Sequence, residues 1–187
     1  CTGCSLCESV CPKHCISMSS DIEGFQIPVI DTNVCIDCGI CYKKCPSSSL
    51  SIQKYPPQKY MAAILDDRSE LLNSSSGGVF IALAKTILSK NGYVCGCIFD
   101  DNMVARHICT NNWDNIKKMM GSKYVQSDMN GCLLEVKKLL EEGHLVMFTG
   151  TACQIAAIVS LVGQPSNLIL VDILCHGVPS PLFLEKY

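Results

Sequence analysis

Two matching runs of cysteine constrain this chain more than any other feature of its sequence. Cys1, Cys4, Cys7 and Cys11 recur 34 residues later as Cys35, Cys38, Cys41 and Cys45, and Pro12 recurs as Pro46. Each copy therefore has the pattern C-x2-C-x2-C-x3-C-P. We expect a segment with this repeat to fold around whatever the cysteines bind rather than around a large apolar core.

The spacing of the thiols indicates an iron-sulfur cluster. Three closely spaced thiolates on one tight loop can reach three irons, whereas the fourth has to arrive from elsewhere. In bacterial ferredoxins of this pattern, the fourth Cys of each run ligates the other cluster of a two-cluster domain. We therefore expect two [4Fe-4S] clusters: cluster one, held by Cys1, Cys4, Cys7 and Cys45, and cluster two, held by Cys35, Cys38, Cys41 and Cys11.

Zinc is the alternative metal, because soft thiolates also bind it. Zinc sites usually pair two C-x2-C knuckles across a longer gap, and two runs of four cysteines exceed that need. Unligated core cysteines would not explain the spacing. Cys15 falls opposite Ser49 in the repeat, so we expect it to be a free thiol rather than a ligand.

Composition separates a metal site from a disulfide framework. The chain has 15 Cys in 187 residues, and nine of them lie in the first 45 positions. No positively charged segment followed by an apolar run precedes Cys1, so we expect a cytoplasmic metal protein rather than an exported disulfide scaffold. The formal net charge of -2 gives no electrostatic footprint for nucleic acid, so we expect no nucleic-acid partner.

The first 55 residues read as one cluster-binding module. A short period-2 strand is expected at 16–18 and again at 50–52, and a strand at 25–30 is confined to an edge by Pro28. The segment contains four Lys and five Asp or Glu, so its formal charge is close to zero. Two anionic clusters would make the loaded module acidic, which favours a basic docking partner. A linker is expected at 51–57.

Residues 59–187 alternate strand-like and helical patterns, which predicts an α/β domain with a mixed, partly parallel sheet. We expect a first strand at 59–65, a helix at 80–88 ended by Asn91 and Gly92, and a surface helix opening at Trp113. The other expected elements are a hairpin of 93–99 and 103–110, a helix at 129–140 with Asp128 near its N-cap, and a βαβ unit of 144–148, 152–162 and 168–174.

The apolar stretch from 145 to 162 has the length of a transmembrane span. Thr149, Gly150, Thr151 and Gln154 interrupt it, so we expect no membrane segment.

Three loops of the α/β region combine features of an anion site. Ser76, Gly77 and Gly78 precede the first long helix, and Thr149, Gly150, Thr151, Cys153 and Gln154 form a strand-to-helix turn. His176 follows the last strand, at the same sheet edge. Lys123 could neutralise a phosphate. The alternatives are a flexible turn with a Ser N-cap, an ordinary βα connection, a small buried Cys, a structural His and a solvated Lys.

The four motifs S-S-G-G-V-F, G-S-K-Y-V-Q-S, F-T-G-T-A-C-Q-I-A and C-H-G-V-P-S-P occur in this order behind the cysteine repeat. With these motifs in succession, the chain resembles the coenzyme F-420 hydrogenase/dehydrogenase beta-subunit family along almost its whole length. The resemblance implies FAD as a further cofactor, with the three loops and Lys123 as flavin-site candidates. It also implies that the chain, which stops at Tyr187 within an expected helix, is truncated at its C-terminus.

The resemblance implies an iron-sulfur flavoprotein oxidoreductase that passes electrons between two [4Fe-4S] clusters, FAD and a small-molecule hydride acceptor or donor such as coenzyme F-420. Clusters exchange single electrons and hydride acceptors take two, so a flavin is the converter between them. Two other hypotheses stay open. One is an electron-transfer subunit that docks a redox partner protein and has no substrate of its own, and the other is a redox sensor.

Overall fold

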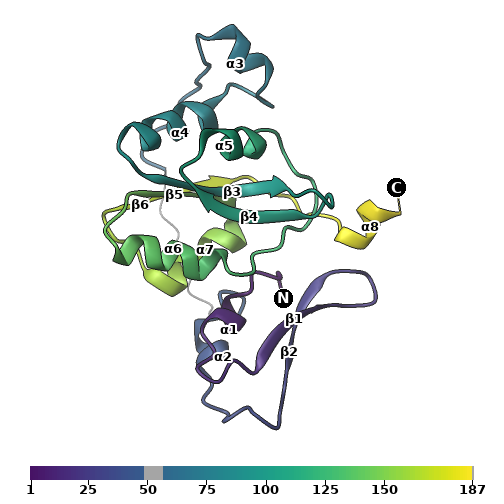
Figure 1. Ribbon diagram of the computed structural model, residues 1–187. Helices are drawn as coiled ribbons and strands as arrows, with labels where there is room; N and C mark the ends of the chain where they lie inside the picture. The colour runs from purple at the N-terminus through teal and green to yellow at the C-terminus, as the bar shows by residue number, and fades with distance from the viewer. Residues whose placement is uncertain (49–56, 187) are drawn as a thin grey trace.

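The computed structural model describes residues 1–48 and 57–186 (Figure 1). A small N-terminal module lies below a larger α/β part in that view. In chain order the elements are α1 (Leu6–Ser9), β1 (Ile16–Ser20), β2 (Gln26–Ile30), α2 (Ile40–Lys44), α3 (Arg68–Leu72), α4 (Val79–Ser89), β3 (Tyr93–Phe99), β4 (Ala105–Thr110), α5 (Trp113–Met119), α6 (Cys132–Glu141), β5 (Val146–Thr151), α7 (Ala152–Val162), β6 (Leu168–Ile173) and α8 (Pro181–Glu185).

The α/β part is built on a four-stranded sheet in the order β4-β3-β5-β6. β3 pairs with β4 in antiparallel fashion, whereas β3 with β5 and β5 with β6 pair in parallel. Helices α4 and α5 cover one face of the sheet, and α6 and α7 cover the other (Figure 1). The predicted mixed, partly parallel sheet and its βαβ unit are confirmed.

The two faces of the sheet have separate apolar cores because side chains alternate across a strand. Cys95 and Phe148 belong to the core beneath α6 and α7, whereas Val94 and Met147 belong to the core beneath α4 and α5; none of the four is measurably exposed. Cys95 also faces Cys109 across β3 and β4, with their Cα atoms 4.1 Å apart, and the two are joined by a disulfide that the sequence did not predict.

The N-terminal module contains a two-stranded antiparallel sheet in which Met18 lies opposite Pro28. Both strands of such a sheet are edges, so Pro28 is accommodated as predicted. The module's own core among the described residues is small, consisting of Cys11, Cys15 and Ile16.

The module also shares a core with the α/β part. Leu6 of α1 is 1% exposed and packs with residues of α6 and α7. Figure 1 shows α1 directly beneath those two helices.

The strand expected at 59–65 is wrong. The structure has no strand there, and Tyr60 and Met61 are 87% and 85% exposed. The backbone N–H of Leu65 donates to Gly77 O, which ties the segment to the start of α4 instead of to a sheet. An apolar run becomes a strand only where another strand completes its hydrogen bonds, and none lies beside this segment in the part of the chain that the structure describes.

Two other expectations change in detail. Helix α6 begins at Cys132 with Gly131 as its N-cap, while Asp128 accepts a hydrogen bond from the Asn130 N–H in the preceding turn. Helix α3, capped by Asp67, was not predicted. The linker expected at 51–57, apart from Pro57, and the second short strand at 50–52 lie outside the described residues, so the boundary between the two parts stays a prediction.

The apolar stretch from 145 to 162 is divided between β5 and α7, which explains its length without a bilayer. Within the described residues, no helix combines the length and apolarity that a membrane crossing needs.

Candidate metal centre

The two cysteine loops have the same backbone fold, as their sequence repeat predicts. Gly3 and Asp37 occupy equivalent positions with φ of 69° and 51°, and Ser5 and Gly39 do so with φ of 58° and 67°. The Gly3 and Asp37 N–H groups each donate to the sulfur two residues earlier, at 3.4 Å in both loops. Left-handed residues turn the chain tightly beside the thiols, at the same two positions in each copy.

The ends of the two loops also correspond. The Cys11 N–H donates to Glu8 O and the Cys45 N–H donates to Tyr42 O, both at 3.3 Å. The fourth cysteine of each copy is therefore held by the short helix that carries the third. This local turn directs the chain out of each loop at the same place.

One pocket gathers cysteines from both copies. It has a volume of about 140 Å³, and its lining includes Cys11, Cys35, Cys38 and Cys41. Three of these come from the second run and one from the first, which is the crossed arrangement expected for cluster two. Cys35 and Cys38 are exposed, so this pocket lies at the surface of the module.

Cys15 lies in the same pocket. Its Sγ is 3.4 Å from Cys11 Sγ, and both side chains are buried. The hydrogen bond with Cys11 raises the pKa of the Cys15 thiol to about 11. Cys15 is thus placed close to an expected ligand, which its lack of a partner in the repeat did not reveal.

Cys4 packs against the core that α6 and α7 share, which places its thiol toward the α/β part. Burial raises the pKa of the Cys4 thiol, and the nearby thiols of Cys45 and Cys153 raise it further. Burial likewise raises the pKa of Cys7, with smaller effects from Cys4 and Cys45. These thiols are therefore close enough to interact electrostatically, and Cys153 from the start of α7 joins them.

The donor set fits an iron-sulfur cluster better than a single metal ion. In residues 1–48 and 57–186, no three His, Cys, Asp or Glu side chains converge closely enough to hold one ion. A cubane takes one thiolate on each of its four irons, so its ligand sulfurs stay farther apart than the ligands of a single ion. Soft thiolates gathered from both cysteine runs, as in the pocket of Cys11, Cys35, Cys38 and Cys41, suit this geometry.

The predicted phosphate loop before α4 is packed against neighbouring backbone. A Cβ atom at Gly77 would lie 2.2 Å from Ala63 O. The N-cap of α4 is Gly78, which is buried with φ of 78°, so the alternative of a Ser N-cap is wrong. Ser76 is exposed, and Ser75 Oγ accepts a hydrogen bond from the Ser122 N–H at 3.1 Å, which brings this loop to the loop of Lys123.

Lys123 caps the end of α5. Its Nζ donates to the carbonyl oxygens of Lys118, Met120 and Gly121 at 2.7 to 3.0 Å. Partial burial lowers the pKa of its ammonium group. The hydrogen-bonding capacity of the ammonium is therefore already used by the helix end.

The predicted strand-to-helix turn is well ordered by its own side chains. Thr151 is the N-cap of α7 and forms a capping box with Gln154. Cys153 Sγ lies 3.1 Å from Thr151 Oγ1, and Thr149 Oγ1 donates to Cys95 O at 3.2 Å. A Cβ at Gly150 would lie 2.9 Å from Gln154 Oε1, so the turn leaves no room for a side chain there.

Gln154 links this turn to a polar network that the sequence did not reveal. Its Nε2 donates to Ser127 Oγ at 2.8 Å, and Ser127 Oγ lies 3.0 Å from His107 Nδ1. His107 Nε2 lies 3.2 Å from Thr149 O. A carbonyl can only accept, so a neutral His107 carries its proton on Nε2 and accepts from Ser127 at Nδ1. His176 is exposed in the loop after β6, and among the described residues it has no hydrogen bond to this network.

His107 is expected to remain uncharged well below neutral pH. Burial lowers its pKa to about 4, whereas the pKa of an unfolded His is about 6.5. The unfolded chain therefore binds a proton first, and up to about 3 kcal/mol of stability is lost as pH falls from about 6.5 to about 4. An NMR titration should show neutral His107 at pH 5. A midpoint near that of an unfolded His would contradict this prediction.

Comparison with known proteins bears on the N-terminal module. Residues 1–49 match a family model described as a 4Fe-4S dicluster domain. A ferredoxin described as 7Fe, from Hydrogenibacillus schlegelii, is 37% identical over 62 residues, which cover 33% of this chain and 73% of that ferredoxin. An uncharacterized ferredoxin from Methanocaldococcus jannaschii is 32% identical over 59 residues, covering 32% of this chain and 75% of its own length.

A third relative is a subunit of a larger assembly. Subunit I of the NADH-quinone oxidoreductase of Pelobacter propionicus is 33% identical over 66 residues. The match covers 30% of this chain and 35% of that subunit. The chain thus spans about a third of subunit I and about three quarters of each of the two ferredoxins.

Proposed function

Because the chain belongs to the 4Fe-4S dicluster ferredoxin family through its first 49 residues, we propose that it is an iron-sulfur flavoprotein oxidoreductase that passes electrons between two [4Fe-4S] clusters and FAD bound by the α/β part. Iron-sulfur electron transfer follows from the family. The two-cluster ligand sets, FAD and a hydride-accepting coenzyme such as F-420 are our proposal. The metal residues are Cys1, Cys4, Cys7 and Cys45 for cluster one and Cys35, Cys38, Cys41 and Cys11 for cluster two.

One observation carries this proposal: the thiol of Cys4, an expected ligand of cluster one, interacts with the thiol of Cys153, the second residue of α7. That helix starts at the carboxyl end of β5, and ligands of parallel sheets bind at this edge. The backbone N–H groups at the start of a helix favour an anion, and here they lie beside the expected position of cluster one. Electrons leaving cluster one would therefore reach the usual cofactor edge of the sheet first.

Each part of the site has a separate role in this proposal. The N–H groups of Gly3 and Asp37 donate to ligand sulfurs, and such hydrogen bonds help to set the potential of a cluster. Thr151 and Gln154 fix the turn that carries Cys153, whose thiol interacts with that of Cys4. When bound, FAD would convert single electrons into a hydride.

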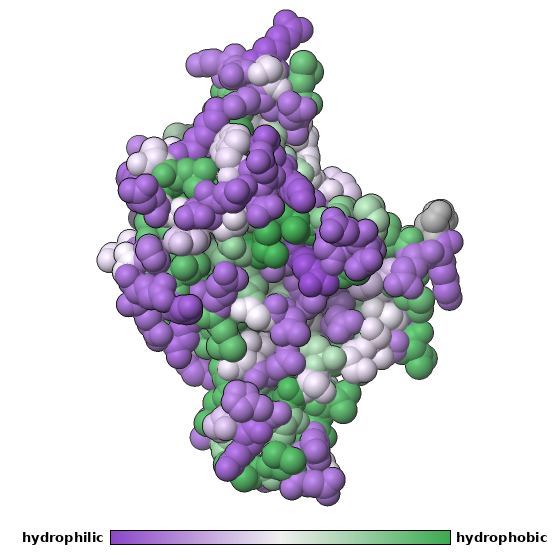
Figure 2. Space-filling view, in the orientation of Figure 1, coloured by the Kyte–Doolittle hydropathy of each residue, from purple (hydrophilic) through white to green (hydrophobic). Residues whose placement is uncertain are grey.

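The outer side of the module suits a redox partner protein. Exposed apolar side chains surround the exposed Cys35 and Cys38; they are Val34, Ile36, Ile40 and Tyr42. Figure 2 shows hydrophobic surface at the lower end of the molecule, where this module lies. We propose that the partner docks there and that its charged groups are basic, since the clusters add negative charge. We also propose a cytoplasmic location, because the eight cysteines expected to bind metal have to stay available as thiolates.

A second function is favoured by the α/β loops themselves. The ammonium of Lys123 is engaged by three carbonyls, and Gly77 packs against Ala63, so two flavin-site candidates already have protein partners. An electron-transfer subunit that docks a catalytic partner, and has no substrate of its own, would need no flavin at these positions.

Cofactor analysis separates the two functions. The full chain, purified without oxygen and reconstituted with iron, sulfide and FAD, is expected to hold about eight irons, about eight sulfides and one flavin. Coenzyme F-420 is then added to the dithionite-reduced protein, and its absorbance is followed. Clusters without stoichiometric flavin would contradict the flavoprotein and support the electron-transfer subunit. Zinc in place of iron would contradict both.

A further inference from the structure

The loop between α5 and α6 contacts the N-terminal module through the side chain of Gln126. Its Oε1 accepts a hydrogen bond from the Gln26 N–H at 2.8 Å, and its Nε2 donates to Thr2 O at 3.3 Å. Its own backbone N–H donates to Pro179 O at 2.9 Å. The side chain of Gln126 therefore joins its own loop to the first cysteine loop and to β2, while its backbone N–H joins the same loop to the segment of Pro179.

Gly3 completes this contact. A Cβ atom at residue 3 would lie 2.3 Å from Gln126 Nε2 and 2.9 Å from Gln26 O. Its φ of +69° also favours glycine. The close approach of the Gln126 amide therefore requires a residue without a side chain between Thr2 and Cys4.

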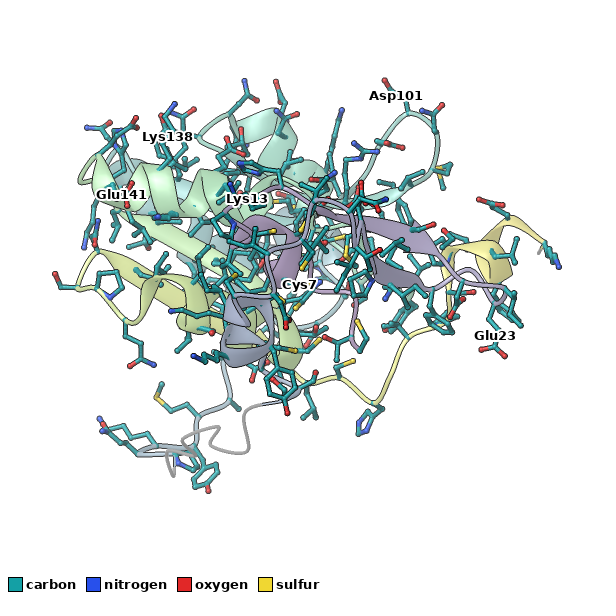
Figure 3. All side chains as sticks on the ribbon, turned by 90° about the horizontal axis from the view of Figure 1, so that it is seen from below. Cys7, Lys13, Glu23, Asp101, Lys138 and Glu141 are labelled. Atoms are coloured by element: carbon teal, nitrogen blue, oxygen red, sulfur yellow. A yellow bond between two sulfur atoms is a disulfide. The ribbon has the colours of Figure 1, made fainter. Side chains whose placement is uncertain are left out.

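The segment after β6 holds the module at a second place. Ser180 Oγ donates to Glu23 O at 2.5 Å, and a Cβ at Gly24 would lie 2.3 Å from Leu182 Cβ. Figure 3 shows Glu23 at the tip of the β1–β2 hairpin, beside α8. Gln126 and Ser180 thus make hydrogen bonds to the module. They belong to two motifs that suggest a flavin site from sequence, G-S-K-Y-V-Q-S and C-H-G-V-P-S-P.

Helix α7 holds the opposite side. Lys44 Nζ donates to Ser160 O at 2.9 Å, and Ser160 Oγ donates back to Lys44 O at 2.6 Å. Lys44 directly precedes Cys45, an expected ligand of cluster one. The ligand loop of cluster one is thus fixed from both sides, whereas Cys35 and Cys38 of cluster two stay exposed.

We propose that Gln126 is a positioning residue that holds residues 1–7 on the α/β part, so that cluster one is the centre at which electrons cross between the two parts and cluster two faces the outer partner. This inference rests on the proposed function for the presence of the clusters. The contact itself is between residues of this chain, so it can be tested apart from any activity.

The test compares Gln126→Ala with Gln164→Ala, a matched loss of an exposed glutamine after α7. In anaerobic holoprotein, Gln126→Ala should speed amide hydrogen exchange at Gln26 about tenfold, because one hydrogen bond is lost. It should also change the EPR signal of reduced cluster one and leave that of cluster two unchanged. Gln164→Ala should change neither.

Gln126→Glu gives a sharper result. A carboxylate keeps an acceptor for the Gln26 N–H but loses the donor to Thr2 O, and it adds a negative charge beside cluster one. Exchange at Gln26 should stay within about twofold of the parent protein, while the reduction potential of cluster one falls, because added negative charge disfavours the reduced cluster. A merely structural role for Gln126 would not shift one potential alone.

The outcomes separate this inference from the proposed function. If Gln126→Ala matches Gln164→Ala in both exchange and EPR, or if the signal of cluster two is the one that changes, the positioning role is overturned. Wild-type protein without iron would overturn the proposed function instead. If β2 stays protected in that iron-free protein, exchange at Gln26 still reports the contact, and unchanged exchange in Gln126→Ala counts against it. If β2 is unprotected there, the positioning role falls with the proposed function.

Discussion

The Cys11→Ser substitution, made in a Cys15→Ser background, is expected to remove cluster two and to leave cluster one in place. Cys11 belongs to the first run, but it lines the same pocket as Cys35, Cys38 and Cys41. The background substitution is needed because Cys15 Sγ lies 3.4 Å from Cys11 Sγ and is placed to take over as a ligand. Iron analysis should fall from about eight to about four atoms per chain.

Two control variants make this result specific. Cys15→Ser alone should keep both clusters, because Cys15 is not an expected ligand. Cys45→Ser should remove cluster one, since the Cys45 thiol interacts with Cys4 and Cys7. EPR of the reduced proteins then shows which cluster each variant keeps. If Cys11→Ser removed the cluster bound by Cys4 and Cys7, the crossed ligand assignment would be wrong.

Removal of iron is expected to unfold the N-terminal module while the α/β sheet persists. The module's own core contains only Cys11, Cys15 and Ile16 among the described residues, whereas the sheet has an apolar core on each face. Metal binding therefore supplies most of the free energy that folds the module. After chelation under reducing conditions, amides of β1 and β2 should exchange at nearly unfolded rates, and those of β3 and β5 should stay protected.

Reconstitution with iron and sulfide is the control, since it should restore the protection of β1 and β2. Reconstitution with zinc should not restore it, because no three ligands within the described residues converge on a single ion. If β1 and β2 stayed protected without metal, contacts such as those of Gln126 and Leu6 would be holding the module by themselves. The link between cluster loading and folding would then be wrong.

Local periodicity predicted most of the α/β fold, because its patterns depend on residues close in sequence. The apolar face of α4 and the run of β3 are examples, and Pro28 at an edge follows from its missing N–H. The failure at 59–65 has the opposite cause. That segment is a short apolar run, but a strand depends on a distant partner, which the pattern of a single segment does not report.

The candidate site was less predictable for the same reason. The cysteine repeat indicates a cluster protein because ligand spacing is local, and the grouping of Cys11 with the second run follows from the ferredoxin pattern. Lys123 was interpreted as a phosphate ligand, yet its position just past α5 is also that of a basic C-terminal cap. The contact of Gln126 with Thr2 joins residues 124 positions apart, and only the folded chain brings them together.

The two cysteine loops have matching backbones, but they differ in how much space a side chain would have at corresponding positions. Gly3 is enclosed by Gln126, whereas its counterpart Asp37 is exposed, and a Cβ atom added at Gly39 would meet no atom of the described residues within 4 Å. The duplicated halves are therefore no longer interchangeable: transplanting the second loop into the first position would drive an aspartate into the interface. Residue 37 is accordingly the place to attach a fluorescent reporter near cluster two without separating the two parts of the molecule.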